Sequence, residues 1–248
     1  MDNALIVLCQ LTKLLTDNEL LGLAQEKRRS FHACRLPRTV EALAFVEAVE
    51  QGVALPLSTL HTHVGPYALF TPGADNTTDT HQKFYAHHEQ VQSLYFALAK
   101  RIITDVIGEP CYLQAIPTYR FGLPDNRWVG SYHRDSDFGH GEYELNAICA
   151  LTPMHNSAAL HVEQNAGNHD FKPLNLERGE VILFDHIDRL HGCPLNREEV
   201  SVASIDFRFV PQRFSEAAFA NAAKSVNTAT AFLPGFYFTR ESVEPGVS

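Results

Sequence analysis

The stretch Tyr132-His133-Arg134-Asp135, followed further along the chain by His191, decides how the sequence is interpreted. Residues i and i+2 of a strand point to the same side, so a short strand ending here would place His133 and Asp135 together. His191 comes after a glycine-led strand pattern, Gly179 to Asp185, and a polar turn. Two imidazoles and one carboxylate can occupy one face of a divalent iron and leave its opposite positions open. We therefore expect His133, Asp135 and His191 to bind iron.

Three other residues near these positions compete for the same metal: His186, Asp137 and His140. The histidine at 186 precedes the polar turn, whereas His191 begins the next strand pattern, and the other two do not share strand spacing with His133. The His61-Thr62-His63 segment also has metal-ligand spacing, but it lacks the Asp-His pair that follows in zinc hydrolases. We expect His63 to line the entrance of the site rather than to bind the metal.

The run Val200–Val210 (VSVASIDFRFV) is rich in residues that favour strands. Ser204, Asp206 and Arg208 fall on one of its faces. Burying an arginine costs free energy unless an anion meets it, and a planar guanidinium can bind both oxygens of a carboxylate. We expect Arg208 to point inward and to hold a dicarboxylate whose other end chelates the metal. The alternative is that Arg208 pairs with Asp206 or with an acidic surface neighbour.

The segment Tyr119–Pro211 resembles the 2-oxoglutarate- and Fe(II)-dependent oxygenases, whose motif is H-x-D, a distal His and then an Arg. The likeness includes the blocks ELNAICALTP (144–153), SAALHVE (157–163), GEVILF (179–184) and SIDFR (204–208). It extends to a subgroup of small-molecule hydroxylases that includes a streptomycin-biosynthesis protein. The resemblance implies that His133, Asp135 and His191 are the iron ligands, that Arg208 binds the distal carboxylate of 2-oxoglutarate, and that O₂ is the oxidant.

The chain departs from this subgroup at Val202, where subgroup sequences often carry another arginine two residues before the serine. Three arginines are possible substitutes: Arg197, Arg213 and Arg120. Further candidates for contacting 2-oxoglutarate are Asn146, Ser204 and Tyr119, and candidates for contacting the substrate are Arg120, His63 and Arg197. The alternative for Asn146 is a hydrogen-bonded core amide. For Tyr119 and Arg120, of which one is expected to face inward, the alternative is plain packing.

Composition limits the partners. A formal net charge of −9 argues against non-specific nucleic-acid binding and against nucleic-acid demethylation, because such binding depends on Lys and Arg neutralising phosphates. No apolar run approaches the roughly 20 residues that span a bilayer. Five cysteines, without C-x-x-C spacing, indicate a reduced, cytoplasmic protein. We expect a small-molecule substrate, no nucleic-acid or membrane partner, and leave the oligomeric state open.

At 248 residues the chain is long enough for one large β-core domain with helical flanks. Residues 1–110 are mainly helical in pattern, with helices expected at Ala4–Leu15, Asp17–Arg28 (opened by an Asp cap), Val40–Glu50 and Asp79–Ile107. Pro56–Thr80 is rich in Gly, Pro, Thr and Asn, and we predict that it forms a substrate lid. Residues 212–248 comprise an expected helix, Ser215–Lys224, and an aromatic closing segment, Phe232–Phe238.

Residues 111–211 show short β runs separated by turn signals: Tyr112–Tyr119, Val129–His133, Glu144–Leu151, Ala158–Glu163, Val181–Phe184, His191–Pro194 and Val200–Val210. About eight such strands predict a double-stranded β-helix, the jelly roll of cupin-like proteins, with room for a ligand between its sheets. The polar segment Asn165–Asn175 is expected to loop outside. The expected fold class is mainly β with helical flanks (α+β).

The function that these patterns favour is oxidative hydroxylation of an amino acid, an aminosugar or another natural-product intermediate, with release of succinate and CO₂. Related halogenases have Gly or Ala at the carboxylate position to admit chloride, so Asp135 indicates hydroxylation, desaturation or ring closure. The main rival is a cupin-like hydrolase, isomerase or dioxygenase that does not use 2-oxoglutarate. A non-catalytic metal-binding module is the weaker rival, because structural zinc usually has four closed N or S ligands and this set offers three.

Overall fold

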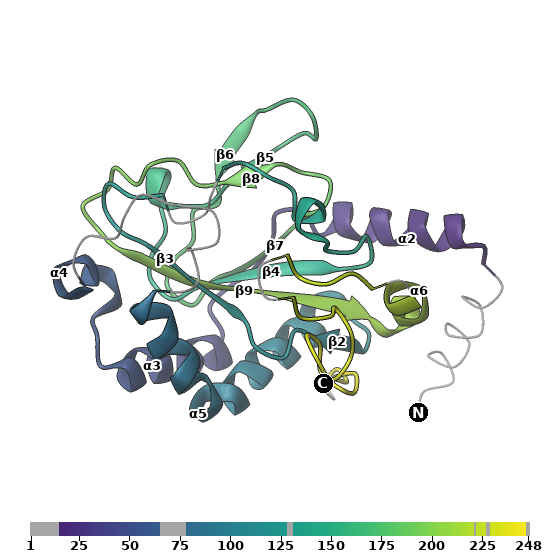
Figure 1. The fold of residues 1–248 in the computed structure, drawn as a ribbon, viewed down its shortest axis with the longest axis horizontal. Helices are drawn as coiled ribbons and strands as arrows, with labels where there is room; N and C mark the ends of the chain where they lie inside the picture. The colour runs from purple at the N-terminus through teal and green to yellow at the C-terminus, as the bar shows by residue number, and fades with distance from the viewer. Residues whose placement is uncertain (1–14, 65–77, 128–130, 221, 227–228, 247–248) are drawn as a thin grey trace.

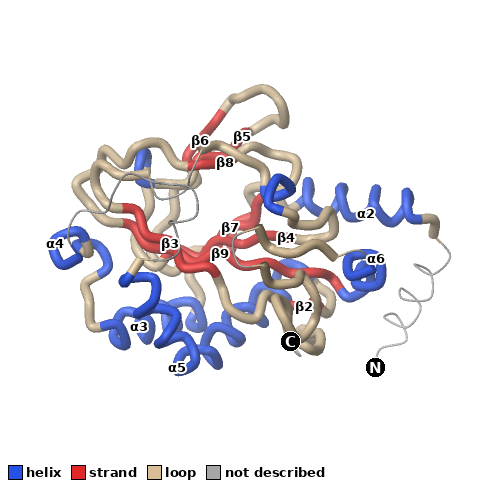
Figure 2. The backbone as a smooth tube through the Cα atoms, viewed as in Figure 1, coloured by secondary structure: helices blue, strands red, loops and turns tan. Residues whose placement is uncertain are grey.

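The structure is a computed structural model, and it describes residues 15–64, 78–127, 131–220, 222–226 and 229–246. Two antiparallel sheets lie one above the other, and helices cover the outer face of the larger sheet (Figure 1). Figure 2 shows how much of the upper half is loop rather than strand. Within the described ranges, no helix is both long and apolar enough to span a bilayer.

The larger sheet has the strand order β1-β7-β4-β9-β2, and β3 pairs with β9 beyond the end of β2. Its strands are β1 Cys34–Leu36, β2 Cys111–Leu113, β3 Thr118–Gly122, β4 Leu145–Ala150, β7 Val181–Phe184 and β9 Val202–Pro211. The smaller sheet has the order β6-β5-β8, formed by β5 His161–Glu163, β6 Phe171–Pro173 and β8 His191–Gly192.

Strand β9 explains why the larger sheet has two different faces. All ten of its residues are buried, and alternate side chains point to opposite sides. One side belongs to the main apolar core between the larger sheet and the helices. The residues of β9 in this core are Ala203, Ile205, Phe207 and Phe209. The opposite side carries Ser204, Asp206 and Arg208, as predicted from the sequence, and faces a cavity between the sheets.

Helices α3 (Val40–Val53) and α5 (Asp79–Ile102) form most of the layer beneath the larger sheet (Figure 1). Each begins after a threonine whose hydroxyl accepts a hydrogen bond from the first turn, Thr39 for α3 and Thr78 for α5. A π-helical turn, Ile103–Ile107, extends α5 toward β2. The other helices are α2 (Asp17–Ser30), α4 (His61–Val64) and α6 (Ser215–Ala220).

Much of the expected secondary structure is confirmed. Helices at 17–28, 40–50 and 79–107 are present with small shifts in their ends, and β7 has the predicted bounds. The N-cap of α2 is Thr16 rather than Asp17, because Thr16 and Glu19 form a capping box. The helix expected at 215–224 ends at Ala220 within the described residues.

Other expectations about elements were wrong. The single strand expected at 112–119 is two strands, since β2 ends at Leu113 and β3 starts after Pro117, which has no N–H to donate to a ladder. The polar segment 165–175 contains the short strand β6, and β1 was not predicted at all. Expectations for 4–14, for the part of the lid at 65–77 and for 128–130 lie outside the described residues.

Candidate metal centre

His133 and His191 come from segments far apart in the sequence that meet through an isolated antiparallel bridge. The N–H of His133 donates to the carbonyl oxygen of His191 at 3.0 Å, and the reverse bond measures 2.9 Å. His191 also belongs to β8, which pairs with β5. The two rings are therefore held by main-chain pairing.

Asp135 reaches the same place by a different route from the one expected. It does not continue a strand from His133 but opens a short 3₁₀ turn, Asp135–Phe138, and its N–H donates to the carbonyl oxygen of His186 at 2.9 Å. The prediction that His133 and Asp135 share one side was correct, whereas its explanation by strand alternation was wrong.

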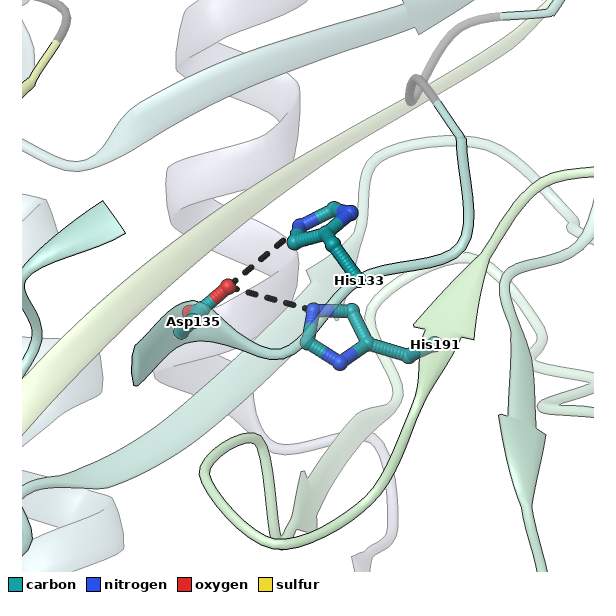
Figure 3. Close-up of side chains that lie close together, drawn as sticks. All are labelled: His133, Asp135 and His191. Atoms are coloured by element: carbon teal, nitrogen blue, oxygen red, sulfur yellow. Dashed lines mark hydrogen bonds and ion pairs between the residues drawn. The ribbon is translucent and has the colours of Figure 1, made fainter. Parts of the chain in front are cut away.

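The three side chains converge (Figure 3). Asp135 Oδ1 lies 3.5 Å from His133 Nε2 and 3.2 Å from His191 Nε2. One ligand atom from each residue falls within 4.8 Å of the other two. The set has the two-histidine, one-carboxylate composition of facial iron sites.

The outer ring nitrogens fix the tautomer of both histidines. His133 Nδ1 lies 2.8 Å from the carbonyl oxygen of Ser131, and His191 Nδ1 lies 3.2 Å from that of Arg189. A carbonyl oxygen only accepts hydrogen bonds, so each Nδ1 carries a proton, and in the neutral form of each ring the Nε2 lone pair points inward. Two lone pairs and a carboxylate oxygen repel one another unless a positive charge lies between them. This donor set fits a divalent cation.

A chain of alternating charges borders the three ligands. Asp135 Oδ2 accepts from Arg208 at 2.6 Å, Arg208 donates to Asp206 at 2.5 Å, and Arg120 donates through Nε to Asp206 at 2.9 Å. Burial alone would raise the pKa of Asp135, but the Arg208 guanidinium holds that pKa well below its usual range. Despite its burial, the pKa of Asp206 is also lowered, by Arg120 and Arg208. Both carboxylates are therefore charged at neutral pH.

These residues line a cavity that opens to solvent, with about 360 Å³ of empty space when the open solvent at its mouth is included. Its polar lining includes Arg120, Asn146, Ser204, Asp206 and Arg208 beside the three candidate ligands. Ile148, Leu160 and Phe184 supply an apolar part of the lining. Both sheets contribute to this lining, so the cavity lies between them. A few convergent polar groups against an apolar wall are typical of small-molecule sites.

Asn146 lies where the sequence placed it, and its Oδ1 is buried without a hydrogen-bond partner among the described residues. A buried amide oxygen without a donor is costly, which favours a bound ligand over a satisfied core amide. Arg208 points inward as expected. The alternative that it pairs with Asp206 is confirmed as well, and Asp135 is a second partner that was not foreseen.

Tyr119 does not reach the cavity, which corrects the expectation that it contacts 2-oxoglutarate. It packs against α5, with its hydroxyl 3.1 Å from His88 Nδ1 and its ring 5.4 Å from that of Phe84. Its cross-strand partner Ile205 faces the main core. Arg120, the next residue, therefore faces the cavity.

Three other candidates lie away from the cavity lining. His63 is exposed on α4, and Arg197 is exposed beside Asp125. Arg213 pairs with Glu109 beyond the end of β9. His186 is fully buried and, unlike His191, is not part of the candidate metal cluster; burial holds its pKa well below the usual value.

Two residues near the site were missed by the sequence interpretation. Gln114 Oε1 accepts from Arg208 at 3.4 Å. Arg28 of α2 is 2 % exposed and binds Asp185 and Asp188, which flank His186 and lead toward His191. Its position within an amphipathic helix gave no signal, because its partners lie more than 100 residues away in sequence, at separations of 157 and 160.

No family model matches the chain. The streptomycin biosynthesis protein StrG of Streptomyces griseus is 34% identical over 168 residues, which cover 68% of this chain and 79% of that protein. This chain belongs to the StrG family. The subgroup resemblance inferred from the sequence is thereby confirmed.

The StrG-family chain also shares its fold with solved non-heme iron enzymes. CytC3 with Fe(II) and alpha-ketoglutarate superposes with a TM-score of 0.52 at 13% identity, covering 94% of this chain and 98% of that one. EctD from S. alaskensis, with 2-oxoglutarate and 5-hydroxyectoine, gives 0.52 at 15% identity and covers 94% and 86%. The carbocyclase SnoK from nogalamycin biosynthesis gives 0.50 at 13%, covering 81% and 85%. The chain shares the fold of these three proteins.

Proposed function

We propose that this protein is an Fe(II)- and 2-oxoglutarate-dependent oxygenase that oxidises a small molecule with release of succinate and CO₂. One observation carries the proposal. Two imidazoles of fixed tautomer and the Asp135 carboxylate converge beside two arginines, Arg120 and Arg208, in a fold shared with enzymes of this class. We further propose that His133, Asp135 and His191 are the iron ligands and that residues 111–211 form a double-stranded β-helix within one oxygenase domain, residues 1–248.

The charges of the cavity support this choice of ligands. Arg120 and Arg208 are balanced by Asp135 and Asp206, so the lining is neutral when both histidines are neutral. A divalent cation would leave two uncompensated positive charges in a confined space. The dianion of 2-oxoglutarate would restore neutrality, and its distal carboxylate suits a guanidinium.

Iron, 2-oxoglutarate and O₂, when bound, supply the oxidising chemistry, as cofactors do in general. The residues of the chain hold the reactants in place. Asp135 is fixed from two sides, through its main-chain N–H by His186 and through Oδ2 by Arg208. The wall formed by Ile148, Leu160 and Phe184 excludes water from one side of the cavity and offers an apolar surface to a carbon skeleton.

Hydroxylation of an unactivated C–H bond is the outcome we propose. In related halogenases a smaller residue at this position leaves room for chloride. Here the Asp135 carboxylate occupies that position as one of the three candidate ligands. The relative StrG is named a streptomycin biosynthesis protein. We extend that to an amino acid, an aminosugar or another natural-product intermediate as the class of substrate.

Anaerobic titration of metal-free protein with Fe(II), then with 2-oxoglutarate, tests the proposal. A weak visible charge-transfer band on the second addition is expected for a keto acid chelated to ferrous iron. Iron binding without this band would favour the rival, a cupin-like metalloenzyme that does not use 2-oxoglutarate. No iron binding would overturn both.

A further inference from the structure

The two arginines of the cavity differ in burial, and Arg208 contacts the candidate metal ligand Asp135. We propose that they divide two tasks: Arg120 receives the distal carboxylate of 2-oxoglutarate, and Arg208 is a positioning residue that holds the metal ligand Asp135. This inference rests on the proposed function, and it revises the expectation that Arg208 is the carboxylate anchor.

Both terminal nitrogens of Arg208 are engaged by the protein. One of its terminal nitrogens donates to Asp135 Oδ2 at 2.6 Å, and the other to Asp206 at 2.5 Å and to Gln114 at 3.4 Å. Its side chain is 5 % exposed. A ligand carboxylate could take both terminal nitrogens only by breaking the pair with Asp135, which would leave that carboxylate buried with less compensation.

Its contact with Asp135 suits a supporting role. Asp135 Oδ1 faces the two histidines, while Oδ2 is bound by Arg208, so Oδ1 is the carboxylate oxygen that would be available to a bound ion. Groups that orient metal ligands in this way commonly change metal affinity by about 10- to 100-fold when removed.

Arg120 is placed to meet a ligand. It is the direct cross-strand partner of Ser204, and residues opposite each other on antiparallel strands project to the same face. Both residues line the cavity. The Arg120 side chain is 20 % exposed, four times the value for Arg208. A guanidinium beside a hydroxyl offers two different donors to one carboxylate.

Asp206 connects the two arginines and gives each a fixed direction. It binds Arg120 through Oδ1 and Arg208 through Oδ2. Each oxygen is thus assigned to one arginine, so replacing Arg120 leaves the Arg208–Asp206 and Arg208–Asp135 contacts in place. The two tasks are therefore separable by mutation.

Calorimetric titrations under anaerobic conditions test this division, with Mn(II) as the metal and then 2-oxoglutarate added to the Mn(II)-loaded protein. For Arg120→Gln we expect the Kd for 2-oxoglutarate to rise about 10- to 100-fold, with the Kd for Mn(II) unchanged. For Arg208→Gln we expect the Kd for Mn(II) to rise by about tenfold or more. Arg120→Lys should recover part of the 2-oxoglutarate affinity, since it restores the charge without the fork.

Controls separate the possible outcomes. Arg197→Gln, at an exposed arginine outside the cavity, should match the wild type for both ligands. Arg208→Lys keeps the charge, and its Mn(II) affinity decides the second task if Arg208→Gln does not fold. If the Mn(II)-loaded wild type does not bind 2-oxoglutarate, the proposed function fails. If the wild type binds and Arg120→Gln binds equally well, or if an Arg208 variant loses 2-oxoglutarate affinity alone, only the division of tasks is overturned.

Discussion

His133 and His191 form an antiparallel bridge and exchange two main-chain hydrogen bonds, 3.0 and 2.9 Å long. In the sequence, 57 residues lie between them. The bridge brings the two rings to a centroid distance of 4.6 Å. Because main-chain pairing does not depend on an ion, the histidines are arranged before any metal binds. The third candidate ligand, Asp135, is held by a side chain as well, through the bond from Arg208 to its Oδ2.

Asp135→Ala should abolish metal-dependent succinate formation, because it removes one of three ligand atoms and leaves Arg208 without one of its two carboxylates. The measurement is succinate released per protein in the presence of Fe(II), 2-oxoglutarate and ascorbate. Asp137→Ala is the matched control, since Asp137 is exposed in the same short turn and accepts a hydrogen bond from the N–H of Arg134. Succinate release at the wild-type rate from Asp135→Ala would falsify the ligand assignment.

Gly192→Ala should weaken metal binding without touching a ligand. A Cβ at this position would lie 3.0 Å from the Cα of Tyr132, so the segment carrying His133 has to move. We expect a loss of about 1–3 kcal/mol of stability, as for other overpacked sites, together with a higher Kd for Mn(II). Thermal unfolding and calorimetry measure the two effects.

Gly22→Ala serves as the contrasting variant for that experiment. Gly22 lies in α2 with open space around its would-be Cβ, and alanine is favoured over glycine in a helix by about 0.5–1 kcal/mol. We expect a higher melting temperature and unchanged Mn(II) affinity. Equal effects of the two alanines on metal binding would contradict the steric argument at Gly192.

Arg28→Met should destabilise the fold by about 3 kcal/mol, because it strips a buried cation from Asp185, which is itself 1 % exposed. Arg28 also holds Glu142 and Asp188, so the turn before His191 loses its tie to α2. Chemical denaturation gives the free energy of unfolding. The neighbouring Arg29, which is 62 % exposed, provides the control: Arg29→Met should change stability by no more than about 0.5 kcal/mol.

His88 should make the protein less stable in mild acid. Burial lowers the pKa of His88 to about 4, whereas in the unfolded chain a histidine titrates near its usual value of about 6.5. Between these values the unfolded state takes up a proton that the folded state refuses, so stability is full above about pH 6.5 and falls as the pH drops toward 4.

The melting temperature of His88→Gln should therefore fall less than that of the wild type when the pH is lowered from 7 to 5. The pKa of His186 is also lowered by burial, so His186 contributes to the fall of the melting temperature with pH in both proteins. His155→Gln, at a histidine with a side chain 42 % exposed, should follow the wild type. Parallel melting curves for His88→Gln and the wild type would show that His88 does not titrate in this range.

The face of β9 could be predicted from sequence because strand alternation is a local rule. Ser204, Asp206 and Arg208 share the cavity side as expected. What the rule could not supply is the partner of Arg208, because Asp135 lies 73 residues away and reaches it only through the folded arrangement of the turn after His133. The shift from an expected dicarboxylate anchor to a support for Asp135 depends on that long-range contact.

The choice between Tyr119 and Arg120 depended on register rather than on residue chemistry. Both were possible inward residues, and pairing Arg120 with Ser204 rather than with a neighbour settles which one faces the cavity. Strand β1 escaped prediction because its three residues are too few to show a period, and it is stabilised by pairing with β7. The capping box at Thr16 and Glu19, in contrast, follows a local pattern that the sequence does display.

The cavity receives ligand groups from both sheets: His191 belongs to β8 of the smaller sheet, whereas Asp135 is tied through Arg208 to β9 of the larger one. A ligand bound in this cavity would therefore contact residues held by both sheets. Ligands that bind only the native state raise the unfolding temperature. Melting curves of the Mn(II)- and 2-oxoglutarate-loaded protein can thus rank a library of amino acids, aminosugars and their conjugates as substrates before any product has been identified.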